Sequence, residues 1–219
     1  MANKTKTEKR KGGQIDKELY IQIGLIVILV LVIGFNLGKV SSGTSGGIGT
    51  VSASEIIPTG IPAIYGNDMG VSYNDVSASN PKLADTTIRK LAQYEDMELS
   101  SEEMARYITI AGSISCEYCC GANSIIFNNG ERACGCAHSF AMRGLAKYLL
   151  RNHPDMTNDA ILSELGKWKV LFFPDIHEQK AQALEANGID STNYINLASN
   201  LYRGIEQGQT SGGSMVGGC

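Results

Sequence analysis

The sequence predicts a mainly α-helical domain that carries a small cysteine-rich β-hairpin, of treble-clef or ribbon-like form, behind a single N-terminal transmembrane helix. Three observations lead to this fold class. An uncharged, mostly apolar run occupies residues 19–38, helix-capping patterns recur after residue 80, and five of the six cysteines fall within residues 114–150. The third observation also indicates a chemistry, because closely spaced cysteines followed by a histidine are typical of a metal-ligand set.

The first 40 residues are expected to form a basic cytoplasmic tail, residues 1–18, and a transmembrane helix, residues 19–40. Six basic and three acidic side chains lie in the tail. Twenty residues of helix rise about 30 Å, which matches the hydrocarbon thickness of a bilayer. Basic residues mark the cytoplasmic flank, so we expect a single-pass protein of the cell membrane, with the lipid bilayer as a partner and the C-terminal domain extracytoplasmic.

A cleaved signal peptide is the competing interpretation of this apolar run. Its apolar segment would be shorter, and no small-x-small cleavage site follows Asn36. The uncleaved anchor is therefore the favoured interpretation.

Two Gly/Ser-rich stretches bound the expected extracytoplasmic domain, residues 55–207. Residues 41–54 predict a flexible linker that spans on the order of 20 Å. Residues 208–219 predict a flexible tail that ends in Cys219. Within the domain, the frequent Pro and Gly of residues 55–80 favour an extended arm over a helix.

Capping signals predict the first two helices of the domain. Asn80 and Pro81 suit the cap and first turn of a helix that continues to about residue 94. Ser100 and Glu103 form a capping-box pattern, which predicts a second helix that ends near residue 112.

Apolar side chains at helical spacing predict two further helices, over residues 137–151 and from about residue 157. Residues 169–173 form a short apolar run that is either a strand or the C-terminal end of the helix that begins near residue 157. Asp175 with Glu178 repeats the capping pattern, and Gly188 suits the left-handed stop of the helix expected between them. A last, weaker helix is expected over residues 194–202.

The β-hairpin is predicted between the two groups of cysteines. Residues 124–127 favour a strand, and the Asn-Asn-Gly sequence of residues 128–130 is strong turn chemistry. Residues 131–134 would return as the second strand, which would bring the two cysteine groups together.

Four cysteines have the spacing of a tetrahedral zinc site. Cys116 and Cys119 would face one point from a tight turn, and Cys134 and Cys136 would follow on the far arm of the hairpin. The helix expected next would place its N-terminus at these thiols, which favours the thiolate form that metals require.

The segment holds more donors than zinc needs. Cys120 adjoins Cys119, and His138 is expected to be a ligand or to lie next to the metal. Met142, one turn later, and Cys219 are further possible ligands, although core packing explains Met142 better. Thiolate, thioether and imidazole together suit a soft ion, so copper(I) is a candidate beside zinc.

The other two histidines and the charged residues give no further site. His153 and His177 are expected on polar surfaces without a special role. The net charge of −3 gives no reason to expect nucleic acid as a partner. The sequence shows no Ser-His-Asp order, phosphate-binding glycine loop or obvious carboxylate pair, so no catalytic residue is assigned.

Disulfide bonding is the first alternative to a metal. All six cysteines would lie outside the cell, where disulfides persist, and their number is even. The protein would then be a disulfide-stapled interaction module. The second alternative is a thiol–disulfide oxidoreductase, although its cysteine pair normally follows a strand and starts a helix, whereas here a helix precedes Cys116.

Two motifs carry a resemblance to known proteins. Residues 116–122 read Cys-Glu-Tyr-Cys-Cys-Gly-Ala, and residues 134–145 read Cys-Gly-Cys-Ala-His-Ser-Phe-Ala-Met-Arg-Gly-Leu. They resemble a family of prokaryotic membrane-anchored, cysteine-rich proteins of uncharacterised function, from about residue 56 to the C-terminus. A fainter similarity is to lipoproteins named for a Cys-Tyr-Cys-Gly-Cys motif. The resemblance implies a metal or thiol centre and no particular reaction.

The sequence therefore predicts a membrane-anchored extracytoplasmic protein whose helical domain holds a Cys/His metal centre. Its function would be to bind, deliver or sense zinc or copper, in contact with the bilayer and with another envelope protein as a candidate partner.

Overall fold

The computed structural model describes residues 21–27, 51–207 and 215–217, and the chain divides into two units, Met1–Gly47 and Ile48–Cys219. The elements of the second unit are short and long helices. In chain order they are α2 (Ala53–Ile56), α3 (Gly66–Met69), the 3-10 helix η1 (Tyr73–Asp75), α4 (Pro81–Ala92), α5 (Ser101–Gly112), α6 (Glu117–Cys120), α7 (Ala137–Asn152), α8 (Asn158–Phe172), α9 (Pro174–Ala186), α10 (Tyr194–Ala198) and the 3-10 helix η2 (Asn200–Tyr202).

The expected transmembrane helix over residues 19–40 falls mostly outside the described residues. Residues 21–27 are helical. Among the described ranges, no helix combines the length and the apolar character that crossing a membrane requires. This part of the expected fold is therefore not supported. The basic tail of residues 1–18 and most of the expected linker also lie outside what the structure describes.

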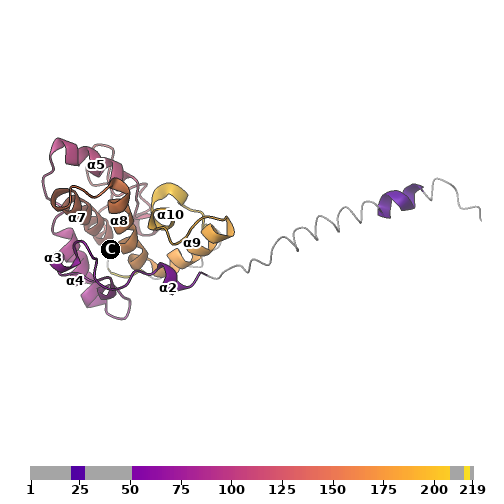
Figure 1. Cartoon of the computed structure of the whole chain (residues 1–219), viewed down its shortest axis with the longest axis horizontal. Helices are drawn as coiled ribbons and strands as arrows, with labels where there is room; N and C mark the ends of the chain where they lie inside the picture. Colours follow the sequence, from indigo (N-terminus) through magenta and orange to yellow (C-terminus); the bar gives the residue numbers. More distant parts are fainter. Residues whose placement is uncertain (1–20, 28–50, 208–214, 218–219) are drawn as a thin grey trace, which may run out of the picture. The chain divides into compact units, whose positions relative to one another are not determined.

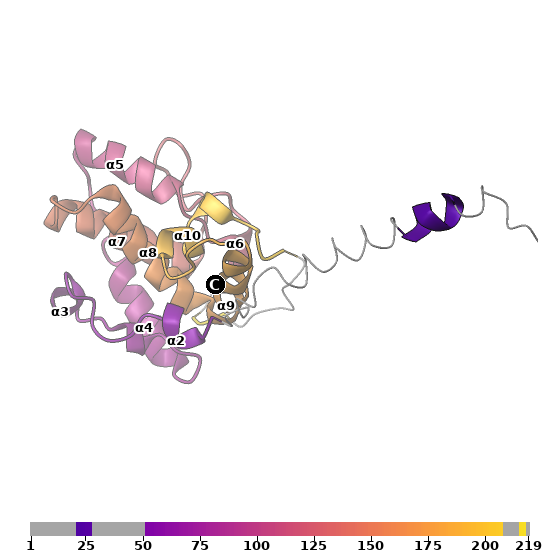
Figure 2. The same cartoon turned by 45° about the vertical axis from the view of Figure 1, so that its right-hand side comes forward.

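Helices α7 and α8 form the centre of the second unit. They pack against each other, and α7 also contacts α4 and α5 while α8 contacts α10 and α9 (Figure 1). The turned view shows the same arrangement, with α4 and α5 on different sides of α7 (Figure 2). Most residues of α7 are buried, which explains why its apolar positions are not confined to one stripe.

A glycine allows the closest of these helix contacts. At Gly144 of α7, an added Cβ would overlap the carbonyl oxygen of Leu91 in α4 and lie 3.1 Å from the Cα of Ala92. Backbone atoms cannot move aside as a flexible side chain can. The spacing between α4 and α7, and with it the position of the α7 N-terminus, therefore depends on Gly144.

The arm of residues 55–80 contains short helices and is tied to α8. Its Tyr65 hydroxyl accepts a hydrogen bond of 2.7 Å from the indole Nε1 of Trp168 and donates one of 2.9 Å to Glu164. Tyr73 donates a second bond of 2.6 Å to Glu164. These contacts bury Tyr65, Tyr73 and Trp168 and hold the arm over the core, although α2, α3 and η1 replace the expected extended chain.

Local capping chemistry explains where α4 and α5 begin. The Asn80 side chain accepts a hydrogen bond from the Leu83 N–H at 3.2 Å, and Ser100 and Glu103 form the expected capping box. Helix α9 lies where a helix between Asp175 and Gly188 is expected, but its start differs. It begins at Pro174 with no side-chain cap, so the Asp175–Glu178 capping pattern was wrong.

The later helix boundaries settle two further expectations. The apolar run of residues 169–173 continues α8 up to Phe172 and is not a strand. Gly188 has a φ of +70°, the left-handed conformation expected of a residue that ends a helix.

The predicted β-hairpin is wrong. The described residues contain no strand, and a single isolated bridge joins Ile126 to Arg132. The turn itself forms, since the Phe127 N–H donates to the Glu131 carbonyl at 2.8 Å and Gly130 has a φ of +85°. The turn chemistry was therefore identified correctly, but the arms on either side of it form one bridge and no strands.

Tertiary hydrogen bonds account for this failure, because they engage the backbone groups that a ladder would need. The Ile125 N–H donates to the carbonyl of Ile114 at 3.0 Å. The Arg143 guanidinium donates to the carbonyl oxygens of Ile125 at 2.9 Å and Cys134 at 2.8 Å. The Ile125 carbonyl also accepts a bond of 3.3 Å from the Ala133 N–H of the other arm. A buried arginine from α7 therefore joins both arms of the loop, which share too few backbone bonds to form strands.

We predict that Gly144→Ala lowers the free energy of unfolding by about 1–3 kcal/mol, because the new methyl group overlaps the backbone of α4. Gly112→Ala is the matched control, since no described atom lies within 4 Å of a Cβ built there. Denaturant unfolding of both variants checks this. An unchanged midpoint for Gly144→Ala would contradict the proposed close packing.

Candidate metal centre

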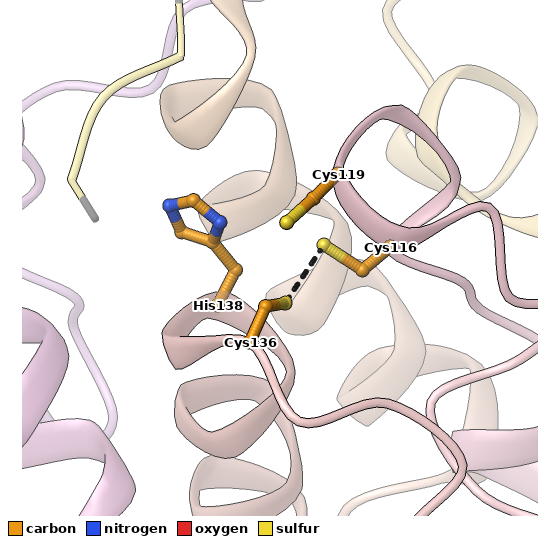
Figure 3. Close-up of side chains that lie close together, drawn as sticks. All are labelled: Cys116, Cys119, Cys136 and His138. Atoms are coloured by element: carbon orange, nitrogen blue, oxygen red, sulfur yellow. Dashed lines mark hydrogen bonds between the residues drawn. The ribbon is translucent and has the colours of Figure 1, made fainter. Parts of the chain in front are cut away.

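Two segments bring the metal-ligating side chains together. Cys116 and Cys119 come from the single turn α6 and the residue before it, and Cys136 and His138 come from the start of α7 (Figure 3). One ligand atom from each of these four residues lies within 4.8 Å of the others. The described residues thus form a group of three sulfurs and one imidazole that can hold a metal ion.

The first segment is a tight turn that points two sulfurs the same way. The backbone N–H groups of Cys119 and Cys120 both donate to the Cys116 carbonyl, at 3.3 and 3.2 Å. Gly121 then ends the turn with a φ of +67°, which favours glycine. A three-residue step on a helical turn places Cys116 and Cys119 on one face.

The second segment is the N-terminus of a sixteen-residue helix. The Cys136 sulfur caps α7 by accepting a hydrogen bond of 3.4 Å from the Ser139 N–H. Positive charge at a helix N-terminus favours a thiolate at this position. The sulfurs of Cys136 and Cys116 are 3.2 Å apart and both residues are buried.

These two sulfurs share one hydrogen bond, and this sets their charge. The bond holds the pKa of Cys136 well below that of an ordinary thiol and raises the pKa of Cys116, and burial adds to the rise at Cys116. The shared hydrogen bond therefore favours the thiolate form of Cys136 beside Cys116. A thiolate next to a thiol is ready to accept a metal cation, which displaces the remaining proton.

His138 is oriented as metal-binding histidines are. Its Nε2 lies 2.8 Å from the Val216 carbonyl oxygen, and because a carbonyl only accepts, Nε2 carries the proton. Its Nδ1 therefore has a lone pair and faces the sulfurs (Figure 3). Within the described ranges this buried Nδ1 has no hydrogen-bond partner. A carbonyl that fixes the tautomer is the usual outer partner of a metal-bound imidazole.

A second group of sulfurs shares Cys136 with the first. Cys120, Cys134 and Cys136 also have their sulfurs within 4.8 Å of one another, and the Cys134 and Cys136 sulfurs are 3.5 Å apart. Cys120 and Cys134 form a disulfide with their Cα atoms 6.7 Å apart. Cys119 is disulfide-bonded as well. Cys116 and Cys136 are the free thiols among the described residues.

The spacing of the sulfurs suits a tetrahedral ion. A zinc–sulfur bond is about 2.3 Å, so two sulfurs on one zinc ion lie about 3.7 Å apart. The observed separations of 3.2 and 3.5 Å are close to this value. Small side-chain rotations would therefore complete the coordination geometry.

Buried positive charge lies beside the sulfurs. Lys169 of α8 is fully buried and donates to Glu117 at 3.0 Å and to the Ala198 carbonyl at 2.8 Å. Arg203 makes a second ion pair with Glu117, also at 3.0 Å. Lys169 is close enough to Cys116 for their charges to interact. It can offset the negative charge of a metal–thiolate centre.

The structure brings six of the expected ligands together. Cys116, Cys119, Cys120, Cys134, Cys136 and His138 all belong to one or both sulfur groups. Met142 is buried in the core and belongs to neither group, in keeping with a packing role. Cys219 lies outside the described residues.

Sequence reasoning missed the contribution of the C-terminal segment. Residues 208–219 were expected to form a flexible tail, yet Val216 is buried and its N–H donates to the Phe172 carbonyl at 2.9 Å. Its own carbonyl orients His138. The signal in the sequence was the apolar pair Met215–Val216 within a Gly/Ser-rich stretch.

His177 also differs from its prediction, because it is fully buried and not on a polar surface. Its ring packs edge-on against Tyr118 of α6 at 5.6 Å. Nearby on α9, Lys180 is buried, and in the described part of the chain its Nζ has no hydrogen-bond partner. Burial, and then the charge of Lys169, lower the pKa of Lys180 to about 8.

No family model, curated protein or solved structure matches this chain. The resemblance to membrane-anchored cysteine-rich proteins therefore stays a prediction, and the site has to be interpreted from its own geometry.

We predict that Lys180→Met stabilises the protein at pH 7, on the order of 1–3 kcal/mol. Below pH 8 the folded protein must bury the charged ammonium of Lys180. In the unfolded chain the same ammonium is exposed to water and its pKa is about 10.5, so charging it disfavours the folded state. The stability of the wild-type protein therefore rises with pH between about 8 and 10.5, and the gain from the variant disappears.

Denaturant unfolding at pH 7 and pH 10 measures this difference. The control is Lys82→Met, which changes an exposed lysine of α4. A Lys180→Met variant that is less stable than wild type at pH 7 would show that the ammonium has a favourable partner.

Proposed function

We propose that this protein binds a thiophilic metal ion, zinc or copper(I), through Cys116, Cys136 and His138, with Cys119 as the fourth ligand when its disulfide is reduced. The observation that supports this most is the His138 Nδ1, a buried acceptor that faces three sulfurs while its Nε2–H is held by a carbonyl. An unsatisfied buried polar atom costs about 1–3 kcal/mol, and a metal ion would remove that cost.

The donor set supports these two metals over others. Thiolate and imidazole ligands suit zinc and copper, whereas magnesium and calcium prefer oxygen. Cys116, Cys136 and His138 can bind the ion without prior reduction of a disulfide. They leave the fourth coordination position open for Cys119 or for an exogenous ligand. Such an open position is compatible with delivery or sensing as well as with storage.

A second candidate function is thiol–disulfide exchange, because the Cys136 sulfur lies 3.5 Å from Cys134 of the Cys120–Cys134 disulfide. The Cys136 thiolate would attack the Cys134 sulfur, a Cys134–Cys136 bond would form, and Cys120 would leave as the thiolate. Cys120 is exposed and could then react with a partner disulfide. This candidate requires no metal, and so the metal content of the protein separates the two.

The disulfide-stapled module is supported only in part. One bridge joins Cys120 to Cys134 and Cys119 is disulfide-bonded as well, but Cys116 and Cys136 remain as buried thiols. A chain that used its cysteines only as staples would not need two free thiols beside an unsatisfied imidazole.

We predict that the full-length chain, purified without oxygen, contains at least about one zinc or copper ion per molecule. His138→Gln should weaken metal binding at least about tenfold, because glutamine fills much of the same space without offering an imidazole nitrogen. The matched control is His153→Gln, since His153 lies at the end of α7 opposite to the sulfurs. Elemental analysis and competition with a chelator provide the measurement.

Free-thiol counts complete this test. A metal-free protein that exchanges disulfides with a dithiol would support the second candidate and contradict the first. Equal metal affinity for the wild-type and His138→Gln proteins would remove His138 from the site.

A further inference from the structure

We infer that the reduced protein holds two divalent metal ions that share the Cys136 thiolate, and that the Cys120–Cys134 disulfide controls whether the second ion binds. This inference rests on the proposed metal-binding function. It adds an outer site, made of Cys120, Cys134 and Cys136, to the inner site of Cys116, Cys119, Cys136 and His138.

The position of Cys136 is the first reason. Its sulfur is 3.2 Å from that of Cys116 and 3.5 Å from that of Cys134, so it belongs to both sulfur groups. A thiolate sulfur has several lone pairs and can bind one ion on each side. No other residue belongs to both groups in the part of the chain that the structure describes.

The second reason is that the outer ligands are already in place. Both sulfurs of the Cys120–Cys134 bridge lie within 4.8 Å of the Cys136 sulfur. Two sulfurs on one zinc ion lie about 3.7 Å apart. Once the bridge is opened, rotation of the Cys120 and Cys134 side chains is therefore enough to bring both sulfurs to the metal distance. The backbone of α6 and of the loop before α7 does not need to move.

Opening the bridge is a balanced redox step. The disulfide takes up two electrons and two protons and becomes two thiols, while a dithiol reductant loses the same electrons and protons and becomes a disulfide. The ion then displaces the thiol protons as it binds. The disulfide at Cys119 is opened by the same chemistry, which completes the inner site.

Charge favours divalent ions in the complete centre. Five thiolates with two divalent ions keep one negative charge, whereas with two monovalent ions they keep three. Lys169 lies beside Cys116 and pairs with Glu117, which Arg203 also pairs with. Glu206 and Lys180 belong to the same set of interacting charges, so three cations face two carboxylates and leave at most one positive charge in excess. Two divalent ions thus match the surroundings of the cluster, and zinc fits this charge and the sulfur ligands.

The two sites also differ in exposure. Cys116, Cys136 and His138 are buried, whereas Cys120 is exposed. The outer site has three protein ligands, so its fourth position faces solvent or a partner. An ion that enters or leaves the centre would therefore do so at Cys120.

Cobalt(II) titration of the full-length protein tests this inference, because cobalt(II) replaces zinc and reports thiolate ligands by its charge-transfer absorption. After anaerobic reduction with a phosphine, we expect two ions per chain with magnetically coupled spins, as a shared thiolate requires. Without reductant we expect one ion. Cys120→Ser should reduce the capacity of the reduced protein from two ions to one, and Asn129→Ser, an exposed change in the neighbouring loop, should leave it at two.

The outcomes distinguish this inference from the proposed function. One ion per chain in the reduced wild-type protein, or two ions with uncoupled spins, would overturn the shared site and leave single-ion binding intact. An unchanged capacity of two in Cys120→Ser would overturn the assignment of the outer ligands. No bound ion under either condition would contradict the proposed function itself.

Discussion

The candidate metal site depends on the fixed orientation of one imidazole ring, that of His138. The Val216 carbonyl accepts the Nε2 proton of His138, and the ring lies against Phe172 and Phe173, at 4.5 and 5.1 Å. These contacts leave the ring little freedom to turn its Nδ1 away from the sulfurs. A ring nitrogen of His138 lies within 4.8 Å of three cysteine sulfurs, and this arrangement favours a ligand that the sulfurs and the imidazole share.

The helical scaffold explains how the ligands are held in fixed positions. Cys136 and His138 begin α7, whose position is set by its close contact with α4 at Gly144. Arg143 reaches from α7 to the loop that carries Cys134. Lys169 reaches the other cysteine segment from α8. Sites supported by rigid elements keep their geometry better than sites on free loops, and here each cysteine segment is held by a buried cation of a central helix.

Helix starts could be predicted from the sequence because they depend on local chemistry. Asn80 and Ser100 cap helices through bonds to residues three positions later, and both caps form. The hairpin could not be predicted, because Arg143 competes for its carbonyl groups from another helix. Burial of His177 likewise depends on where Tyr118 packs. Both of these errors come from contacts that are distant in the sequence.

The candidate site could likewise be predicted only in part from the sequence. Spacing alone identified the six residues that converge, but it could not show which sulfurs are bonded to each other and which are free. It also gave no indication that Val216 fixes the ring or that Lys169 lies buried beside Cys116. Whether a cysteine is thiol, thiolate or disulfide is decided by three-dimensional neighbours and by redox conditions.

X-ray absorption at the edge of the metal that copurifies with the full-length chain tests the central claim most directly. We expect at least two sulfur neighbours at about 2.3 Å and one nitrogen neighbour at about 2.0–2.1 Å. A first shell of oxygen atoms alone, or a protein that contains no metal, would contradict it.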